Sequence, residues 1–192
     1  MILEAIVTTL DDAGEVHFAP MGPAVEGTDF ARFFLRPYPT SHTYQNLRRH
    51  GEGVLHVTDD VLLLARAAIG RVEPPPDVVS AVRVRGFVLS GACRWYEFRV
   101  VSIDDARERV RIEAEVIHAG RGRDFFGFNR AKHAVVEAAI LATRTAFLPA
   151  EHIAEEFRRL AILVEKTGGP DERAAFDLLR DHVTRAAGGV VP

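Results

Sequence analysis

RPYPTSHTYQNLRR, residues 36–49, places two prolines ahead of two hydroxyl side chains and a short helix-forming run. Pro37 and Pro39 hold the chain extended, because proline fixes its own φ and disfavours helix in the residue before it. Thr40 and Ser41 then offer hydroxyls that can cap a helix. The pattern predicts a short helix with four residues of the segment on it, Thr43, Tyr44, Asn46 and Leu47.

The start of this helix is a candidate phosphate site. Its unpaired N–H groups and the positive end of its dipole point at the same place as the hydroxyls. Arg36 adds a planar guanidinium that matches phosphate geometry better than lysine does. The alternative is a capped surface helix, ending near Gly51, with arginines that are merely solvated. The segment by itself leaves both interpretations open.

Composition sets the outer limits. A chain of 192 residues suits one domain with room for an appendage, and 47% hydrophobic with 27% charged residues is ordinary for a globular protein. The formal net charge of −3 argues against a broad surface for nucleic acid or for anionic membranes. We therefore expect neither nucleic acid nor a membrane as a partner.

The single cysteine, Cys93, excludes an internal disulfide and suits a reducing cytoplasm. The first twelve residues lack a basic region and already contain acids, so we expect neither a signal peptide nor a membrane span there. Other apolar segments are too short to cross a bilayer. These features predict a cytoplasmic protein.

Several strands are expected before residue 60. Residues 2–10 are rich in β-branched side chains, and the turn residues 11–14 lead into Val16 and Phe18, which predicts a hairpin. Residues 30–35 are expected to form a strand buried on both faces, and residues 53–58 a further strand.

Asp59 and Asp60 precede an apolar segment that stops at Gly70, which is typical of a helix with an acidic start. A metal site or carboxylate pair is the weaker reading, because adjacent residues rarely share one ligand sphere. The proline run at residues 73–77 is expected to start a new element rather than to divide domains. Residues 77–89 fit either helix or strand.

Residues 91–102 and 107–118 are two further expected strands. Val110, Ile112, Ala114 and Val116 alternate with charged residues in the second, which indicates a half-solvated antiparallel strand. Trp95 and Tyr96 face opposite sides, so we expect only one of them in the core, and the sequence does not say which. Cys93 beside Arg94 is read as a buried small hydrophobe rather than as a catalytic thiol.

The last third of the chain is helical in pattern. Asn129 is a good N-cap for a mostly small and apolar run, whose first turn is crowded by Arg130, Lys132 and His133. Two amphipathic helices follow, one after Pro149 and one after Pro170. They are expected to form a packing appendage or part of a subunit interface.

Four segments in order resemble the DUF447 family of FMN-binding split-barrel proteins, which are related to flavin reductases. They are VTTLDDAGEVHFAPMG at 7–22, RPYPTSHTYQNL at 36–47, CRWYEFRV at 93–100 and GFNRAKHAVVEAAILATR at 127–144. The resemblance implies an α+β, mainly β fold: an antiparallel, Greek-key-like FMN-binding split barrel over residues 1–128. It also implies a helical extension over residues 129–192, packed on the barrel or on the partner of a homodimer.

The resemblance further implies FMN as cofactor. In such flavoproteins a Thr-x-x-Asn helix start lies at the flavin phosphate, and Thr43–Asn46 match it. The predicted FMN contacts are Thr8, Thr9, Met21, Gly22, Arg36, Ser41, Thr43, Tyr44, Asn46, Asn129, Arg130 and Lys132.

Simpler readings of these residues remain. Gly22 can mark a strand that ends at a Pro/Gly break, and Asn129, Arg130 and Lys132 can form a solvated basic helix start. No catalytic residue stands out. The function is therefore either an FMN-dependent oxidoreductase of unknown substrate or a non-catalytic module that binds flavin or another phosphorylated cofactor.

Other chemistries lack their motifs. The eight histidines form no HExxH or HxH, and CxxC is absent, so a zinc enzyme is not supported. GxGxxG, GxxxxGK[ST] and GxSxG are absent too, which disfavours dinucleotide, P-loop and serine-hydrolase sites.

Overall fold

The computed structural model describes residues 1–27, 30–106 and 109–188, which divide into two compact units. The barrel unit holds the described residues of 1–58 and 76–125, and the helical unit holds residues 59–75 and 126–188. The chain thus enters the helical unit twice, which the expected division at residue 128 did not include. The prediction that the proline run at residues 73–77 would not divide domains was wrong, because the boundary between the units falls inside it, after Pro75.

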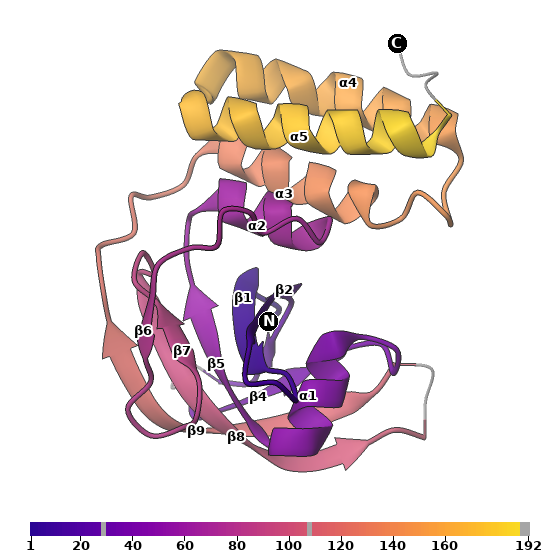
Figure 1. Cartoon of the computed structure of the whole chain (residues 1–192). Coiled ribbons are helices and arrows are strands. Elements are labelled where there is room, and N and C mark those ends of the chain that lie inside the picture. The colour runs from indigo at the N-terminus through magenta and orange to yellow at the C-terminus, as the bar shows by residue number, and fades with distance from the viewer. Residues whose placement is uncertain (28–29, 107–108, 189–192) are drawn as a thin grey trace. The chain divides into compact units, whose positions relative to one another are not determined.

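In the described part of the barrel unit, seven strands form one curled antiparallel sheet (Figure 1). The spatial order is β2-β1-β5-β8-β9-β4-β3. The strands are β1 Ala5–Leu10, β2 Val16–Met21, β3 Ala24–Val25, β4 Arg32–Leu35, β5 Glu52–Val57, β8 Arg94–Asp104 and β9 Arg111–Arg121. The β1–β2 hairpin predicted from the turn residues is confirmed, with Thr8 opposite Phe18.

The main core lies on one face of this sheet, with helix α1 (His42–His50) against it. Phe33, Leu55, Phe98 and Ile112 are fully buried there, and Tyr96 stacks on Phe30 with ring centroids 4.2 Å apart. These contacts answer the question that the sequence left open, because Tyr96 is the member of the Trp95–Tyr96 pair that enters the main core.

Trp95 is partly buried against a second, smaller cluster on the other face. It packs with Val54, Val84 and Val88, and a Cβ at Gly120 would lie 2.0 Å from its ring, so only glycine fits beside it. The expectation that only one of the two aromatic residues enters the core is confirmed, because Trp95 is only partly buried against this smaller cluster. Cys93 is buried nearby, as predicted for a small hydrophobe.

The predicted strand at residues 30–35 was right in place but wrong in burial. Strand β4 begins at Arg32, whose exposed guanidinium lies 3.2 Å from the Glu113 carboxylate on β9. One face of β4 is thus open to solvent. The alternation predicted for residues 110–116 is confirmed on β9, while its expected start at Arg107 lies outside the described residues.

The ambiguous segment 77–89 forms a second sheet, the hairpin of β6 Val78–Ser80 and β7 Phe87–Leu89. Three buried polar side chains of the large sheet hold its backbone. The Thr8 hydroxyl donates to the Phe87 carbonyl at 2.7 Å, the Leu89 N–H donates to His56 Nε2 at 3.1 Å, and the Glu97 carboxylate accepts the N–H groups of residues 82–84. Long-range hydrogen bonds therefore decide the structure here.

Four helices form the described part of the helical unit: α2 Val61–Ala68, α3 Arg130–Ala142, α4 Ala150–Thr167 and α5 Pro170–Ala186. Figure 1 shows α4 and α5 side by side, with α2 and α3 as a second layer against them. The predicted cap Asn129 is confirmed on α3, and the helix expected after Asp59 and Asp60 is present, with Asp60 accepting from the Leu63 N–H. Within the described residues, no helix is long and apolar enough to span a membrane.

Candidate functional site

The start of α1 has the geometry predicted from residues 36–49. Ser41 is extended and its hydroxyl oxygen accepts the Tyr44 N–H at 3.2 Å, while the hydroxyl donates to the Tyr38 carbonyl at 2.8 Å. Gly51, at φ 68°, ends the helix in the left-handed region. Four residues of α1 are buried, and they are those predicted to lie on it, Thr43, Tyr44, Asn46 and Leu47.

Two backbone amides at this helix start are unpaired among the described residues. Ser41 supplies acceptors for the N–H groups of Tyr44 and Gln45, but those of His42 and Thr43 have no acceptor among the described residues. Arg36 lies just upstream with an exposed side chain, and no described carboxylate is within ion-pair distance of it. Unpaired amides at a helix N-terminus can hold an anion, and an unpaired guanidinium can contribute to such a site.

The other predicted contacts from the barrel unit are engaged within the protein. Asn46 Nδ2 donates to Thr9 Oγ1 at 3.0 Å, and both side chains are buried, which fastens α1 to β1. Thr8 is bonded to the Phe87 carbonyl, and the Tyr44 hydroxyl donates to Asp105 Oδ2 at 3.2 Å. These residues fix the position of α1 and of the first hairpin.

Met21 and Gly22 lie at the end of the first hairpin. Met21 is partly buried against the main core. Gly22 is exposed, and a Cβ there would lie 3.0 Å from Ile2 Cγ2, so close packing of Ile2 already favours glycine. The role of both residues at a flavin ring stays a prediction.

The start of α3 is built differently from that of α1. Asn129 Oδ1 accepts the N–H groups of Ala131 and Lys132 at 2.8 and 3.1 Å, and its Nδ2 donates to the Thr167 carbonyl at 3.1 Å. The Lys132 ammonium donates to the Asp59 carbonyl at 2.7 Å and lies 2.8 Å from Glu172 Oε1. Arg130 is exposed and makes no ion pair within the described residues.

The ion pair with Lys132 affects the pKa of Glu172. Burial by itself would raise the pKa of the Glu172 carboxyl, but hydrogen bonds from Lys132 and the Gly169 amide outweigh it and lower the pKa. The ammonium is thus the internal counter-ion of a buried carboxylate. A contact of Asn129, Arg130 or Lys132 with FMN stays a prediction.

The sequence did not reveal a pair of histidines near the start of α1. His17 on β2 and His42, the first residue of α1, have ring centroids 5.3 Å apart. Burial lowers the pKa of His17, the charge of His42 lowers it further, and Asp11 partly opposes both. No sequence signal could have shown this pair, because it depends on the packing of α1 against β2.

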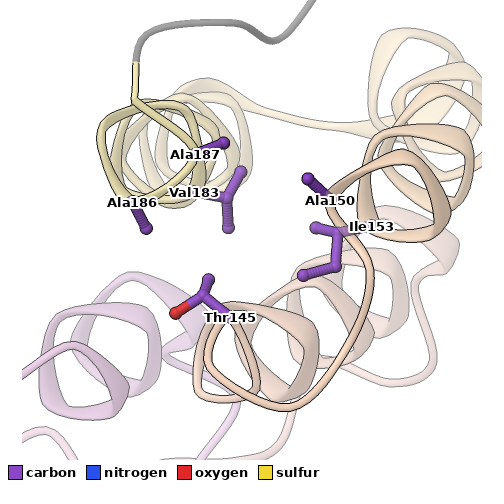
Figure 2. Close-up of a pocket in the computed structure, with 6 residues that line it drawn as sticks. All are labelled: Thr145, Ala150, Ile153, Val183, Ala186 and Ala187. Carbon is purple, nitrogen blue, oxygen red and sulfur yellow. The ribbon is translucent and has the colours of Figure 1, made fainter.

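The helical unit contains a small apolar pocket (Figure 2). Its side chains come from the turn after α3, the start of α4 and the end of α5, and they are Thr145, Ala150, Ile153, Val183, Ala186 and Ala187. Its volume of about 110 Å³ is well below the 300 Å³ or more that ordinary ligand pockets have. It is therefore no candidate for a mononucleotide.

The curled antiparallel sheet of the barrel unit is that of the split-barrel proteins. Two solved structures share this fold at low identity. The flavin reductase of styrene monooxygenase from Pseudomonas putida S12 is 17% identical over 62% of this chain and 77% of its own, with a TM-score of 0.52. An FMN-binding protein from Thermus thermophilus is 13% identical over 62% and 70%, with a TM-score of 0.53.

The family is shown by the sequence itself. Residues 3–123 match the N-terminal domain of the protein of unknown function DUF447, and residues 129–181 match the second DUF447 model. The chain belongs to this family. An FMN-bound DUF447 protein from Methanosarcina mazei is 25% identical over 94% of both chains, with a TM-score of 0.81. No curated protein matches the sequence.

Proposed function

We propose that the protein binds FMN in its barrel unit, with the phosphate at the start of α1 and the ring along the first hairpin. One observation carries the proposal: among the described residues, the N–H groups of His42 and Thr43 have no acceptor and Arg36, earlier in the chain, has no ion-pair partner. The FMN-bound relative from Methanosarcina mazei, similar over 94% of both chains, supports the same cofactor.

The residues present fit a phosphate dianion. Arg36 supplies a charged fork and the two amides supply hydrogen-bond donors at the positive end of the helix dipole. Ser41 acts as the cap that aims those amides, because its hydroxyl is already bonded to Tyr38 and Tyr44. Asn46 braces α1 against Thr9 of β1. Thr43, buried on the helix, contributes through its backbone.

The ring would lie along the first hairpin, near Thr8, Thr9, Met21 and Gly22. Bound FMN supplies hydride and electron transfer, and the share of the protein is to bind and orient it. The Thr8 and Thr9 hydroxyls form hydrogen bonds inside the barrel unit, so they would support the hairpin rather than contact the ring. Exposed backbone at Gly22 is the part of the hairpin end that can approach a planar ring.

The proposed activity is that of an FMN-dependent oxidoreductase, and the proposed assembly is a homodimer with FMN near the subunit boundary. The flavin reductase of styrene monooxygenase has the same fold, which supports this class of reaction. The alternative is a non-catalytic flavin-binding module. That alternative is favoured by the lack of a recognisable general acid or base among the proposed contacts.

Two measurements test the proposal in order. Calorimetric titration of the purified chain with FMN is expected to show saturable binding with one FMN per chain, and no binding would refute it. NAD(P)H consumption by the FMN-loaded protein, with and without added electron acceptors, then separates the two classes. Steady turnover supports the oxidoreductase, and an inert bound flavin supports the module.

A further inference from the structure

The helical unit contains an open groove large enough to hold a small organic molecule. It lies along α2, the segment that follows α2, and α5. Its volume is about 760 Å³, in the range of small-molecule sites. Its lining residues are Leu62, Arg66, Gly70, Arg71, Val72, Glu73, Ala174 and Leu178.

Two guanidinium groups in the groove have no carboxylate partner. Neither Arg66 nor Arg71 takes part in an ion pair within the described ranges, although most of the ion pairs there involve arginine. Arg66 is half-buried as a residue, and Arg71 is exposed. Two guanidinium groups that line one groove without a carboxylate partner can bind an acidic ligand.

The surroundings strengthen the positive charge of this region. Burial lowers the pKa of His182 on α5, and the charges of Arg71 and Arg185 lower it further, which places those arginines within electrostatic reach of the imidazole. Arg71 thus lines the groove, and its charge also lowers the pKa of His182. An anion in the groove would meet more than one positive group.

Two features of the groove disfavour an anion, and neither cancels the two positive charges of Arg66 and Arg71. Glu73 also lines the groove, but one carboxylate against two arginines leaves a net positive charge. The C-terminal carbonyls of α2 carry the negative end of its dipole. They are already bonded, since Arg66 O accepts the Arg71 N–H at 2.8 Å and Ala67 O accepts the Gly70 N–H at 3.2 Å.

The rest of the lining is apolar. Leu62 on α2, Val72 after it and Leu178 on α5 supply branched side chains, and Ala174 leaves room between them. A ligand that fits needs an acidic group at one end and an apolar body at the other. Inorganic phosphate would use the arginines but would leave the apolar part of the groove wet.

We propose that this groove binds a small organic acid, with its acidic group against Arg66 and Arg71 and its apolar body along Leu62, Val72 and Leu178. The site lies within the helical unit, and the inference does not depend on FMN binding in the barrel unit. Failure of one proposal would leave the other standing.

The test is calorimetric titration of the full chain with 2-naphthoate and with its uncharged amide. Saturable binding of the acid with one site per chain is expected, and the amide should bind about tenfold more weakly because it lacks the charge. Arg66→Gln and Arg71→Gln should each weaken 2-naphthoate at least about fivefold, and Glu73→Gln should strengthen it.

Arg180→Gln is the matched control. Arg180 lies on α5, is exposed and pairs with Asp177, so its loss removes the same charge outside the groove. It should leave 2-naphthoate affinity unchanged. Arg66 lies in the last turn of α2, where its positive charge favours the helix, so a far-UV melting curve is recorded for each variant. Arg71 lies after α2, so Arg71→Gln tests the site without changing a residue of the helix. Equal binding of acid and amide, no saturable binding, or equal weakening by Arg180→Gln would overturn the proposal.

Discussion

The starts of α1 and α3 look alike in sequence and differ in structure. Each begins with a polar cap, Ser41 or Asn129, and each has basic residues close by. At α3 one basic group, Lys132, is used internally, because it bonds to the Asp59 carbonyl and pairs with Glu172, while Arg130 is exposed and unpaired within the described residues. At α1 the nearby Arg36 and two amides have no partner among the described residues.

This difference separates structural from binding roles. A polar group that has an intramolecular partner contributes to folding, and its loss should lower stability. A polar group that lacks one contributes when a ligand arrives, and its loss should lower affinity. The four predictions below apply this rule to groups with partners and to groups without them.

The largest effect is expected from His56 in the barrel unit, which has partners on both ring nitrogens. Its Nδ1–H donates to the Ile6 carbonyl and its Nε2 accepts the Leu89 N–H, so the ring is neutral. Burial lowers the pKa of His56 from 6.5 to about 4, although the bond to Ile6 opposes this shift. The unfolded chain therefore binds a proton first as the pH falls.

The stability that His56 contributes is complete above pH 6.5 and is lost as the pH falls toward 4, by about 3 kcal/mol in total. Glu172 has a lowered pKa, so its contribution in the helical unit is complete above pH 4.5 and is lost only below it. Hydrogen exchange at pH 7 and pH 5, corrected for intrinsic rates, should show protection lost in the barrel unit first. An NMR titration of the His56 ring with a midpoint near 6.5 would contradict this.

The next effect concerns the buried pair in the helical unit. Lys132→Met should lower stability by about 2 kcal/mol, because the Glu172 carboxylate stays buried without its counter-ion. Urea unfolding measures the loss. Lys166→Met removes the same group at an exposed position of α4 and should cost little. Weaker FMN binding at unchanged stability would instead place Lys132 in the flavin site.

The opposite pattern is expected for Arg36. Arg36→Ala should weaken FMN about tenfold, since one charge-assisted bond contributes roughly 1.5 to 3 kcal/mol, and should leave the melting temperature unchanged. Arg32→Ala is the matched control, because Arg32 is an exposed arginine on β4 that already pairs with Glu113. Calorimetric titration distinguishes them, and equal affinities for both variants and the wild type would remove Arg36 from the site.

The smallest effects are expected at the two caps. Ser41→Ala and Asn129→Ala should each cost about 1 kcal/mol of stability, since both remove an acceptor for helix N–H groups. Ser41→Ala should in addition weaken FMN about threefold by loosening the amides that face the phosphate. Both variants are compared by urea unfolding and by FMN titration. If Asn129→Ala lost as much FMN affinity as Ser41→Ala, the start of α1 would not be distinguished from that of α3 as the phosphate site.

Local signals in the sequence predicted much of the fold. Ser41, Gly51, Asp60 and Asn129 act within a few residues of themselves, and each ends or begins a helix as expected. The pairing of Lys132 with Glu172 could not be predicted, because the two residues are far apart in the chain.

The segment 77–89 stayed open between helix and strand for the same reason. Its structure depends on hydrogen bonds from Thr8, His56 and Glu97, none of which is near it in sequence. The candidate site was likewise predictable only in part. The cap and the buried face of α1 followed from residues 36–49, but which of its polar groups stay unpaired depends on the packed structure.

The most direct test of the phosphate site compares FMN with riboflavin, which lacks the phosphate, in the wild type and in Arg36→Ala. Calorimetric titration should show that the wild type prefers FMN by about tenfold or more, and that Arg36→Ala loses most of this preference while its riboflavin affinity is unchanged. If Arg36→Ala keeps the full preference for FMN, the phosphate is held elsewhere and the site at the start of α1 is wrong.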